Sequence, residues 1–260
     1  MKLLTTGALL ARSRQVAGIA GILAVWEALA RAGVINPFLM PPPSDLAFAA
    51  VALASDGALL RHTLASLERV VVGFLAASFV GLILGVALGR SRVLSDVLRP
   101  VVEALRPIPP IAWTPIAILW FGVGNAPSYF LVFIGAVFPV FVNTFAAVRN
   151  IDRTHINAAL CLGAGPWLIV RDVLVPASLP LIFPGLRVAL GVGWMCVVAA
   201  ELIAAQSGLG YMIQQNRVLL QTQNVVTGMV TIGLIGFMMS AAMGWIERRI
   251  IAWSPSARDH

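Results

Sequence analysis

Residues 157–163 read Asn-Ala-Ala-Leu-Cys-Leu-Gly, and Val173-Leu174-Val175-Pro176 follow shortly after. This glycine-broken segment lies between two apolar runs, 126–148 and 180–205. Each run is long enough to cross a bilayer, for which about 20 residues suffice. The segment therefore predicts a surface connection between two membrane spans.

The composition also predicts a membrane protein with several spans. Hydrophobic residues make up 59% of the 260 residues and charged residues 11%, which leaves too little polar surface for a soluble globule. About six apolar runs are long enough to span as helices: 16–34, 66–89, 100–121, 126–148, 180–205 and 225–247. We therefore expect an all-α membrane protein, with both termini on one side.

The basic residues predict which side that is, because lysine and arginine near span ends are retained in the cytoplasm. The residues expected on the cytoplasmic side are Lys2, Arg12, Arg14, Arg90, Arg92, Arg99, Arg149, Arg153, Arg171, Arg248, Arg249 and Arg258. Those expected outside are Arg31, Arg61 and Arg217. Both termini and the 157–163 segment are thus predicted to be cytoplasmic. These charges face lipid and account for the net charge of +7, so nucleic-acid binding is not expected.

A proline-rich run over 36–45 cannot stay helical and predicts an external linker. Ser44 and Asp45 offer a cap for a surface helix over 46–60. The expected divisions of the chain are a cytoplasmic tail with the first span in 1–35, the linker and surface helix in 36–60, a core in 61–250 that contains a cytoplasmic loop over 150–178, and a cytoplasmic tail in 251–260.

The cytoplasmic loop is predicted to hold a short helix. Asp152 or Thr154 can accept hydrogen bonds from the free amides at its start, and Gly163 suits a left-handed end. Pro166 prevents its continuation. Ile156, Ala159, Leu160 and Cys161 would form one apolar side of this helix. By itself such a helix is either a connector on the membrane surface or a docking site for a partner.

Residues 106–115 bring four prolines into the expected third span. Prolines remove helix donors and disfavour helical geometry in the residue before each ring, so this helix is predicted to be broken or strongly kinked. Non-helical backbone at membrane depth is tolerated where protein buries it or where it lines a water-filled path. Both a transport path that includes Arg106, Pro109, Pro110 and Trp113 and a purely structural kink remain open.

Small residues recur every four positions in the second span, where they would let another helix approach closely. They are Gly73, Ala77, Gly81, Gly85 and Gly89. This pattern predicts a packed helix bundle.

Catalytic and metal-binding patterns are absent from the sequence. A phosphate-binding Walker loop needs a glycine-lysine pair, and Lys2 is the only lysine. His62, His155 and His260 lack acidic or cysteine neighbours at ligand spacing, so neither a metal site nor a catalytic triad is expected. The chain is not expected to hydrolyse ATP or to hold a cofactor.

Glu201 falls near the end of the fifth expected span, where an ionised side chain is costly and is usually paired or functional. Arg69 or Arg106 on another helix could pair with it, whereas Arg187 lies too far along the same helix. Arg106 could also attract an anion, although Glu103 lies three residues before it and could neutralise it. The sequence leaves a structural ion pair and a place in the transport path open for Glu201.

Several motifs together resemble the transmembrane permeases of ABC importers for taurine, aliphatic sulfonates and nitrate. Segment 157–163 with Pro176 resembles their EAA loop, with Asn157 in place of the usual glutamate. Further motifs run from about Pro41 to Trp253: His62–Leu67 with Arg69 and Gly73, Arg106–Trp113, Ile118–Gly124, Gly185–Arg187, Ala199–Ile203 and Gly208–Tyr211.

The resemblance implies a type I importer permease that forms a homodimer in the bacterial inner membrane. It also implies two ABC ATPase subunits that carry ATP and magnesium, and a periplasmic or lipid-anchored binding protein. Asn157, Ala158, Ala159, Gly163 and Pro176 would then couple ATPase movement to the spans. Arg106, Pro109, Pro110, Trp113, Arg187 and Glu201 would belong to the translocation pathway.

The expected substrate is a small anion, with taurine or another alkanesulfonate first and nitrate, bicarbonate or cyanate next. The alternative is a scaffold or sensor subunit that docks a cytoplasmic partner and moves no solute.

Overall fold

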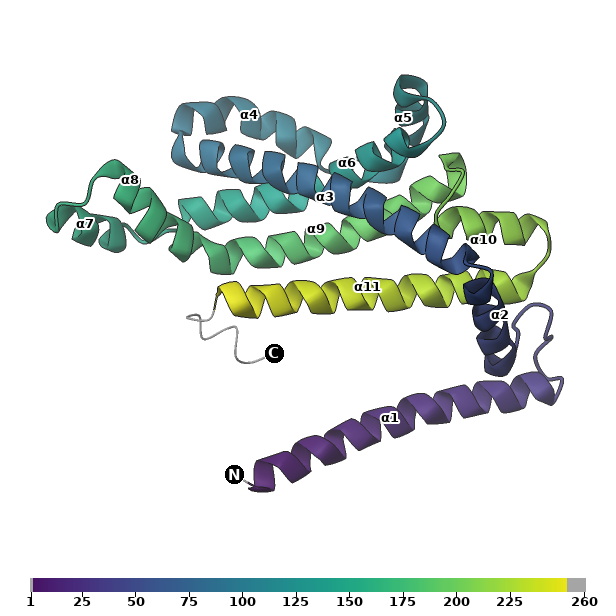
Figure 1. The fold of residues 1–260 in the computed structure, drawn as a ribbon. Coiled ribbons are helices and arrows are strands. Elements are labelled where there is room, and N and C mark those ends of the chain that lie inside the picture. The colour runs from purple at the N-terminus through teal and green to yellow at the C-terminus, as the bar shows by residue number, and fades with distance from the viewer. Residues whose placement is uncertain (1, 252–260) are drawn as a thin grey trace. The chain divides into compact units, whose positions relative to one another are not determined.

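The computed structural model describes residues 2–251, and the side chains of all of these except 2–13, 15, 16 and 153. Every regular element in this range is a helix (Figure 1). The helices are α1 (Lys2–Arg31), α2 (Pro43–Ser55), α3 (Ala58–Arg90), α4 (Arg92–Leu105), η1 (Pro110–Trp113), α5 (Thr114–Phe121), α6 (Asn125–Arg149), α7 (Arg153–Cys161), α8 (Pro166–Ile169), η2 (Val170–Leu174), α9 (Val175–Ala204), α10 (Leu209–Val218) and α11 (Thr222–Ile250).

Among the described residues, four helical segments are long and apolar enough to cross a membrane. They are Ala58–Arg90, Asn125–Arg149, Pro166–Ala204 and Thr222–Ile250. These segments confirm four of the expected spans and a protein that crosses the membrane several times. The expected first span lies on α1, and the expected tail over 251–260 lies outside the described residues except for Ile251.

The expected third span, 100–121, is not one helix. Helix α4 ends at Leu105, a non-helical stretch follows, and η1 begins at Pro110 and leads directly into α5. The predicted break at the prolines is confirmed, and 100–121 is not among the segments that are long enough to cross a membrane as one helix. The physical reason is the one that the sequence offers, since each proline removes a donor and disfavours helical geometry before it.

The stripe of small residues on α3 packs against α6. A Cβ atom added at Gly73 would lie 2.6 Å from the Cβ of Val132, and one added at Gly81 would lie 2.9 Å from the Cβ of Val140. Ala77, between them on α3, is fully buried in the core together with residues of α6 and α9. The close approach of α3 and α6 thus depends on the absence of side chains along one line of α3.

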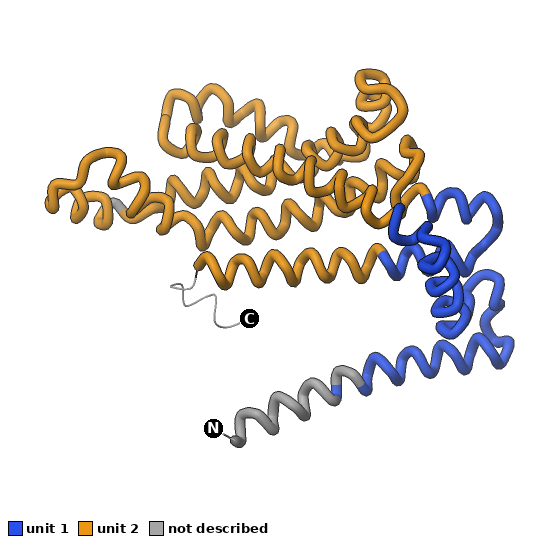
Figure 2. Tube along the Cα trace, in the orientation of Figure 1, with its two compact units in different colours: residues 1–61, 212–231 blue, residues 62–211, 232–260 orange. Residues whose placement is uncertain are grey.

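The described chain divides into two compact units (Figure 2). One comprises residues up to 61 together with 212–231, and the other comprises 62–211 together with the chain from 232 onward. In the second unit, α3 and α6 end beside the α7–α8 region, where α9 begins (Figure 1).

The linker region in the first unit departs from one expectation. Helix α2 begins at Pro43, and no side chain caps its start. Ser44 instead contacts Glu27 of α1, with its backbone amide 3.1 Å and its hydroxyl 2.9 Å from the carboxylate. The predicted cap by Ser44 or Asp45 was therefore wrong. Proline fits the first turn of a helix, where the missing amide proton has no intrahelical acceptor, and Ser44 donates its hydrogen bonds to Glu27 of α1 instead.

Candidate functional site

Helix α7 forms where the loop motif predicts it. The side chain of Asp152 accepts a hydrogen bond from the Thr154 amide at 2.8 Å, which lowers the pKa of this carboxyl group. At the other end Gly163 has φ +78°. The Gly163 amide donates to the Leu160 carbonyl and the Ala164 amide to the Ala159 carbonyl. This pair of bonds is the Schellman arrangement, which satisfies carbonyls that the helix end leaves free.

The residues of the motif divide between two faces of α7. Asn157 and Ala158 are exposed, whereas Ile156 and Ala159 are half-buried. Leu160 is exposed, although its spacing from Ile156 and Ala159 places it on the same side of the helix. Leu162, which is 89% exposed, and Trp167 on α8 are further exposed apolar side chains of this region. Exposed apolar surface of this kind is typical of a protein contact.

Pro176 lies in the first turn of α9, but the helical chain does not begin there. It runs from Pro166 through α8 and the π-helical turn η2 into α9 without a break, and the whole segment counts as one span. A proline inside a helix has no amide proton and collides with the carbonyl four residues earlier. The wider π turn immediately before Pro176 is the local distortion that accommodates this ring.

Glu201 is almost completely buried, at 1% exposure, and its partner is Arg69 on α3. Nη1 of Arg69 lies 2.6 Å from Oε1 of Glu201. The Ser66 hydroxyl, one turn before Arg69, also donates to the carboxylate, and the Gly210 amide donates to its other oxygen at 3.0 Å. Arg106 is therefore not the partner, and Arg187 is excluded as the sequence predicts.

The rest of the Arg69 guanidinium is also satisfied. It donates to the side-chain oxygen of Asn125 on α6 and to both the carbonyl and the hydroxyl of Ser207, each at 2.6 Å. The pair thus ties α3, α6 and α9 to the turn that follows α9. A buried charge is tolerated when it is paired and fully hydrogen-bonded, and this network meets that condition.

Two glycines make room for this network. Gly208 has φ +108°, and a Cβ there would overlap the Glu201 carboxylate. A Cβ at Gly210 would lie 2.6 Å from the Val198 carbonyl. Ser66, Asn125 and Ser207 were missed by sequence reasoning. The one available signal was the Gly-Leu-Gly turn shortly after an intramembrane glutamate.

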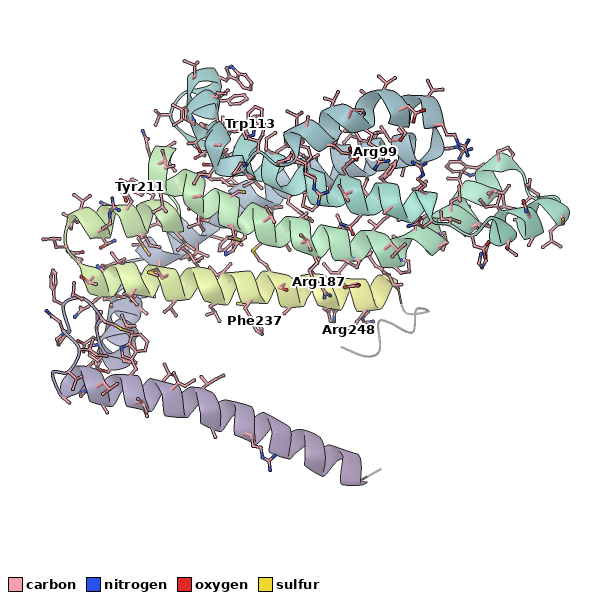
Figure 3. All side chains as sticks on the ribbon, turned by 180° about the vertical axis from the view of Figure 1, so that it is seen from behind. Arg99, Trp113, Arg187, Tyr211, Phe237 and Arg248 are labelled. Carbon is pink, nitrogen blue, oxygen red and sulfur yellow. The ribbon has the colours of Figure 1, made fainter. Side chains whose placement is uncertain are left out.

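Arg187 and Arg106, both predicted in the path, have different surroundings. Arg187 forms an ion pair with Glu247, which joins α9 to α11, and Figure 3 shows it on the side of α9 that faces α11. Glu103 pairs with Arg99 at 2.7 Å rather than neutralising Arg106. Within the described range, no ion pair involves Arg106.

Arg106 lines a hollow of about 290 Å³. The proline-rich stretch, α6 and α9 form its walls, which include Pro110, Phe138, Asn143 and Val192. Pro109 beside it is exposed. Trp113 is half-buried and meets Phe130 edge-on at 6.4 Å, so in this structure it packs the core. Arg106, which is itself exposed, thus lies at the edge of a small hollow with mostly apolar walls.

Comparison with known families places the chain among transport proteins. Residues 71–252 match the model of the binding-protein-dependent transport system inner membrane component. The taurine transport system permease protein TauC of Escherichia coli (strain K12) is 36% identical over 240 residues, which is 90% of this chain and 87% of the relative. A putative aliphatic sulfonates transport permease protein, SsuC of Bacillus subtilis (strain 168), is 33% identical over 90% of this chain and 85% of its own length.

Two further comparisons extend this result. The nitrate import permease protein NrtB of Leptolyngbya laminosa is 34% identical over 76% of this chain and 71% of its own length. A solved inward-facing conformation of the MetNI methionine ABC transporter matches the fold with a TM-score of 0.66 and 22% identity, over 76% of this chain and 98% of that one.

Proposed function

This chain belongs to the binding-protein-dependent transport inner-membrane component family, as an ABC importer permease of the taurine, sulfonate and nitrate group. On that premise we propose that it carries a small anion inward. The first candidate is taurine or another alkanesulfonate, and nitrate, bicarbonate or cyanate come next. The working transporter consists of two copies of this chain, two ABC ATPase subunits that bind ATP and magnesium, and an external binding protein.

Arg106 carries the substrate proposal, because it lines a mostly apolar hollow and forms no ion pair with a described residue. A guanidinium recognises a sulfonate or carboxylate through charge and paired donors. The walls supplied by Phe138, Val188 and Val192 suit a short alkyl chain better than a fully hydrated inorganic ion. Pro109 precedes η1 and Pro110 begins it, so the break between α4 and η1 comes directly after Arg106.

The coupling proposal rests on α7 and its continuation. The exposed Asn157 and Ala158 form the docking surface together with Leu160 and Leu162, and Gly163 ends it sharply. Movement of a docked ATPase then passes through α8 and the π turn beside Pro176 into α9. Glu201 and Arg187 lie on α9, and their ion pairs transmit that movement to α3 and α11.

Uptake by the complete transporter in proteoliposomes tests both proposals. We expect ATP-dependent import of an alkanesulfonate that depends on the loaded binding protein. Arg106→Gln should lower the uptake rate at least tenfold, while Arg61→Gln, which removes an exposed charge elsewhere on the chain, should leave it close to normal. ATP hydrolysis without uptake of an alkanesulfonate, nitrate, bicarbonate or cyanate would favour a scaffold or sensor subunit over a permease.

A further inference from the structure

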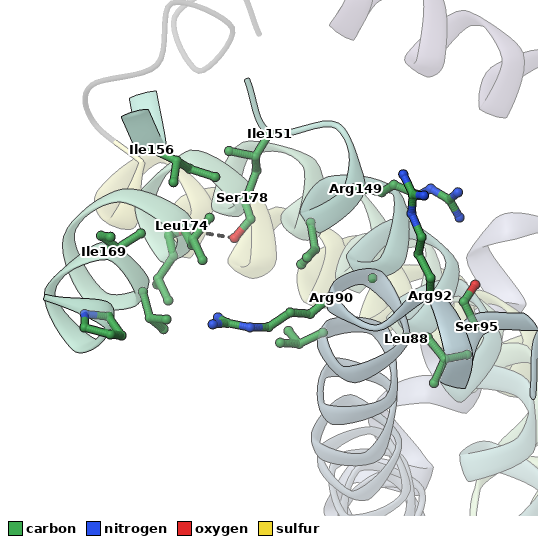
Figure 4. Close-up of a pocket in the computed structure, with 16 residues that line it drawn as sticks. Leu88, Arg90, Arg92, Ser95, Arg149, Ile151, Ile156, Ile169, Leu174 and Ser178 are labelled. Carbon is green, nitrogen blue, oxygen red and sulfur yellow. Dashed lines mark hydrogen bonds between the residues drawn. The ribbon is translucent and has the colours of Figure 1, made fainter. Parts of the chain in front are cut away.

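A second hollow, of about 580 Å³, lies at the opposite end of the spans from the Glu201 network, where α3 and α6 end and α9 begins. Figure 4 shows this hollow, which is lined mainly by aliphatic side chains. Leu88 comes from α3, Ile156 from α7, Ile169 from α8 and Leu174 from the π turn. The cavity therefore connects the expected coupling helices with the membrane-spanning core.

Three arginines line the same hollow: Arg90 at the end of α3, Arg92 at the start of α4 and Arg149 at the end of α6. In Figure 4, Arg92 and Arg149 extend toward one side of the hollow while Arg90 reaches into it. Several other arginines of the second unit have acidic partners, among them Arg99 with Glu103 and Arg187 with Glu247, whereas Arg248 and Arg249 form no ion pair with a described residue but line no part of this hollow.

No carboxylate within the described residues forms an ion pair with any of these three arginines. The Arg149 guanidinium lies over the Phe145 ring, with 5.6 Å from its Cζ to the ring centroid, and this is a contact that offsets no charge. Three arginines without a carboxylate partner among the described residues therefore line one hollow, with Arg92 and Arg149 together on one side of it and Arg90 reaching into it. Retention of basic residues near span ends explains their location, but it does not explain why they gather around an apolar hollow.

We propose that this hollow binds the headgroup of an anionic phospholipid. Arg92 and Arg149, which extend to the same side, contact the phosphate, Arg90 reaches into the hollow toward the rest of the headgroup, and the upper part of an acyl chain lies against Ile169 and Leu174. The hollow lies at the level where lipid phosphates are found in a bilayer, because Arg90 and Arg149 are the last residues of membrane spans. Apolar walls beside a cationic group select an amphiphile over a free inorganic anion.

The bound lipid would have a mechanical consequence. It would contact α7 and α8 on one side and α3, α4 and α6 on the other, and would hold the coupling helices against the core. Anionic lipid should therefore strengthen the link between ATP hydrolysis and transport without contributing to the substrate path.

Lipid retention tests the proposal. The complete transporter is placed in nanodiscs of phosphatidylethanolamine with or without phosphatidylglycerol, and then released for native mass spectrometry. We expect the wild type to retain phosphatidylglycerol and the triple variant Arg90→Gln, Arg92→Gln, Arg149→Gln to retain at least tenfold less. The matched control is Arg171→Gln, Arg248→Gln, Arg249→Gln, which removes the same charge from the same end of the second unit and should retain lipid normally.

Other results would overturn the proposal. Equal loss of lipid in both triple variants would mean that only general surface charge attracts it. Displacement of the lipid by millimolar inorganic phosphate would make the site one for a soluble anion, and crosslinking of position 92 to the ATPase in place of lipid would make it a protein contact. If the glutamine variant does not fold, the Arg→Lys triple variant keeps the charge, and it should show a partial loss because lysine cannot bind phosphate in a bidentate way.

Discussion

The Nη1 atom of Arg69 donates to Oε1 of Glu201 across 2.6 Å, and this bond joins residues that are 132 positions apart. The two side chains are 1% and 0% exposed. Together with Ser66, Asn125, Ser207 and the Gly210 amide, they form a saturated polar cluster inside an apolar bundle. The cluster fixes the ends of three helices relative to one another.

Removal of one partner of the Arg69–Glu201 ion pair should therefore lower the free energy of unfolding strongly. Arg69→Met leaves the Glu201 carboxylate buried without a counter-ion, and breaking such a pair costs about 3–5 kcal/mol. Thermal unfolding in detergent should show a large drop in midpoint. Arg99→Met breaks an exposed pair and should cost about 0–1 kcal/mol. Equal effects of the two substitutions would mean that the buried pair contributes little.

Gly208 should not tolerate a side chain. Gly208→Ala puts a methyl group into the Glu201 carboxylate at a backbone angle that disfavours alanine. We expect poor recovery of folded protein by size-exclusion chromatography. Gly191→Ala is the control, because a Cβ there meets nothing within 4 Å. Normal recovery of both variants would contradict the described turn.

The contact between α3 and α6 predicts a second packing effect. Gly81→Leu forces a side chain against Val140 and should destabilise the bundle by about 1–3 kcal/mol through overpacking. Gly233→Leu on α11, where a Cβ has open space, should change the unfolding midpoint much less. A comparison of thermal unfolding curves distinguishes these outcomes, and an unchanged midpoint for Gly81→Leu would show that the helices can separate freely.

Leu220 is a site where stability can be gained. It has φ +58°, a conformation that costs a non-glycine residue about 1–2 kcal/mol. The Gln221 amide bonds to the Asn216 carbonyl, so α10 ends in the same arrangement as α7 but with leucine in the glycine position. Leu220→Gly should raise the unfolding midpoint, whereas Leu219→Gly, at a position without positive φ, should not. A lower midpoint for Leu220→Gly would indicate that its side chain makes a stabilising contact.

Asp152 should support coupling through the start of α7. Asp152→Ala removes the hydrogen bond to the Thr154 amide and should speed amide exchange in α7 while lowering ATPase stimulation, whereas Asp152→Asn keeps an acceptor and should preserve both. The pKa of this carboxyl group is lowered in the folded protein, so its contribution is present at neutral pH and is lost only as pH falls through the lowered pKa. The ordinary pKa of an aspartate is about 4, and that of Asp152 is lower still, so the carboxyl group stays ionised between about pH 6 and 8. ATPase stimulation should therefore not change through titration of Asp152 in this range.

Local signals in the sequence predict much of this architecture. Asp152 and Gly163 define α7 because a cap acceptor and a left-handed glycine act within a few residues. The prolines after Arg106 likewise predict the break before α5. These features depend on neighbours along the chain and are readable without a fold.

Contacts between helices that are distant in the chain could be predicted less well from the sequence. Arg69 and Arg106 were both eligible partners for Glu201, and only the packing of α3 against α9 decides between them. Arg106 has no ion pair with Glu103 because Glu103 pairs with Arg99, one helical turn earlier. Both arginines lie at a spacing that allows a pair with Glu103, so the sequence does not determine which one forms it. That Arg90, Arg92 and Arg149 line one hollow could not be predicted, because it depends on how the ends of three helices are placed.

Affinity purification of the tagged chain from its native membrane in mild detergent, followed by mass spectrometry, tests the central claim most directly. An importer permease should bring an ABC ATPase with it, and Gly163→Asp, which adds a charge and strains the end of α7, should lose that ATPase while the chain still inserts. Repeated recovery of the intact, folded chain without any ATPase would contradict its role as the permease of an ATP-driven importer.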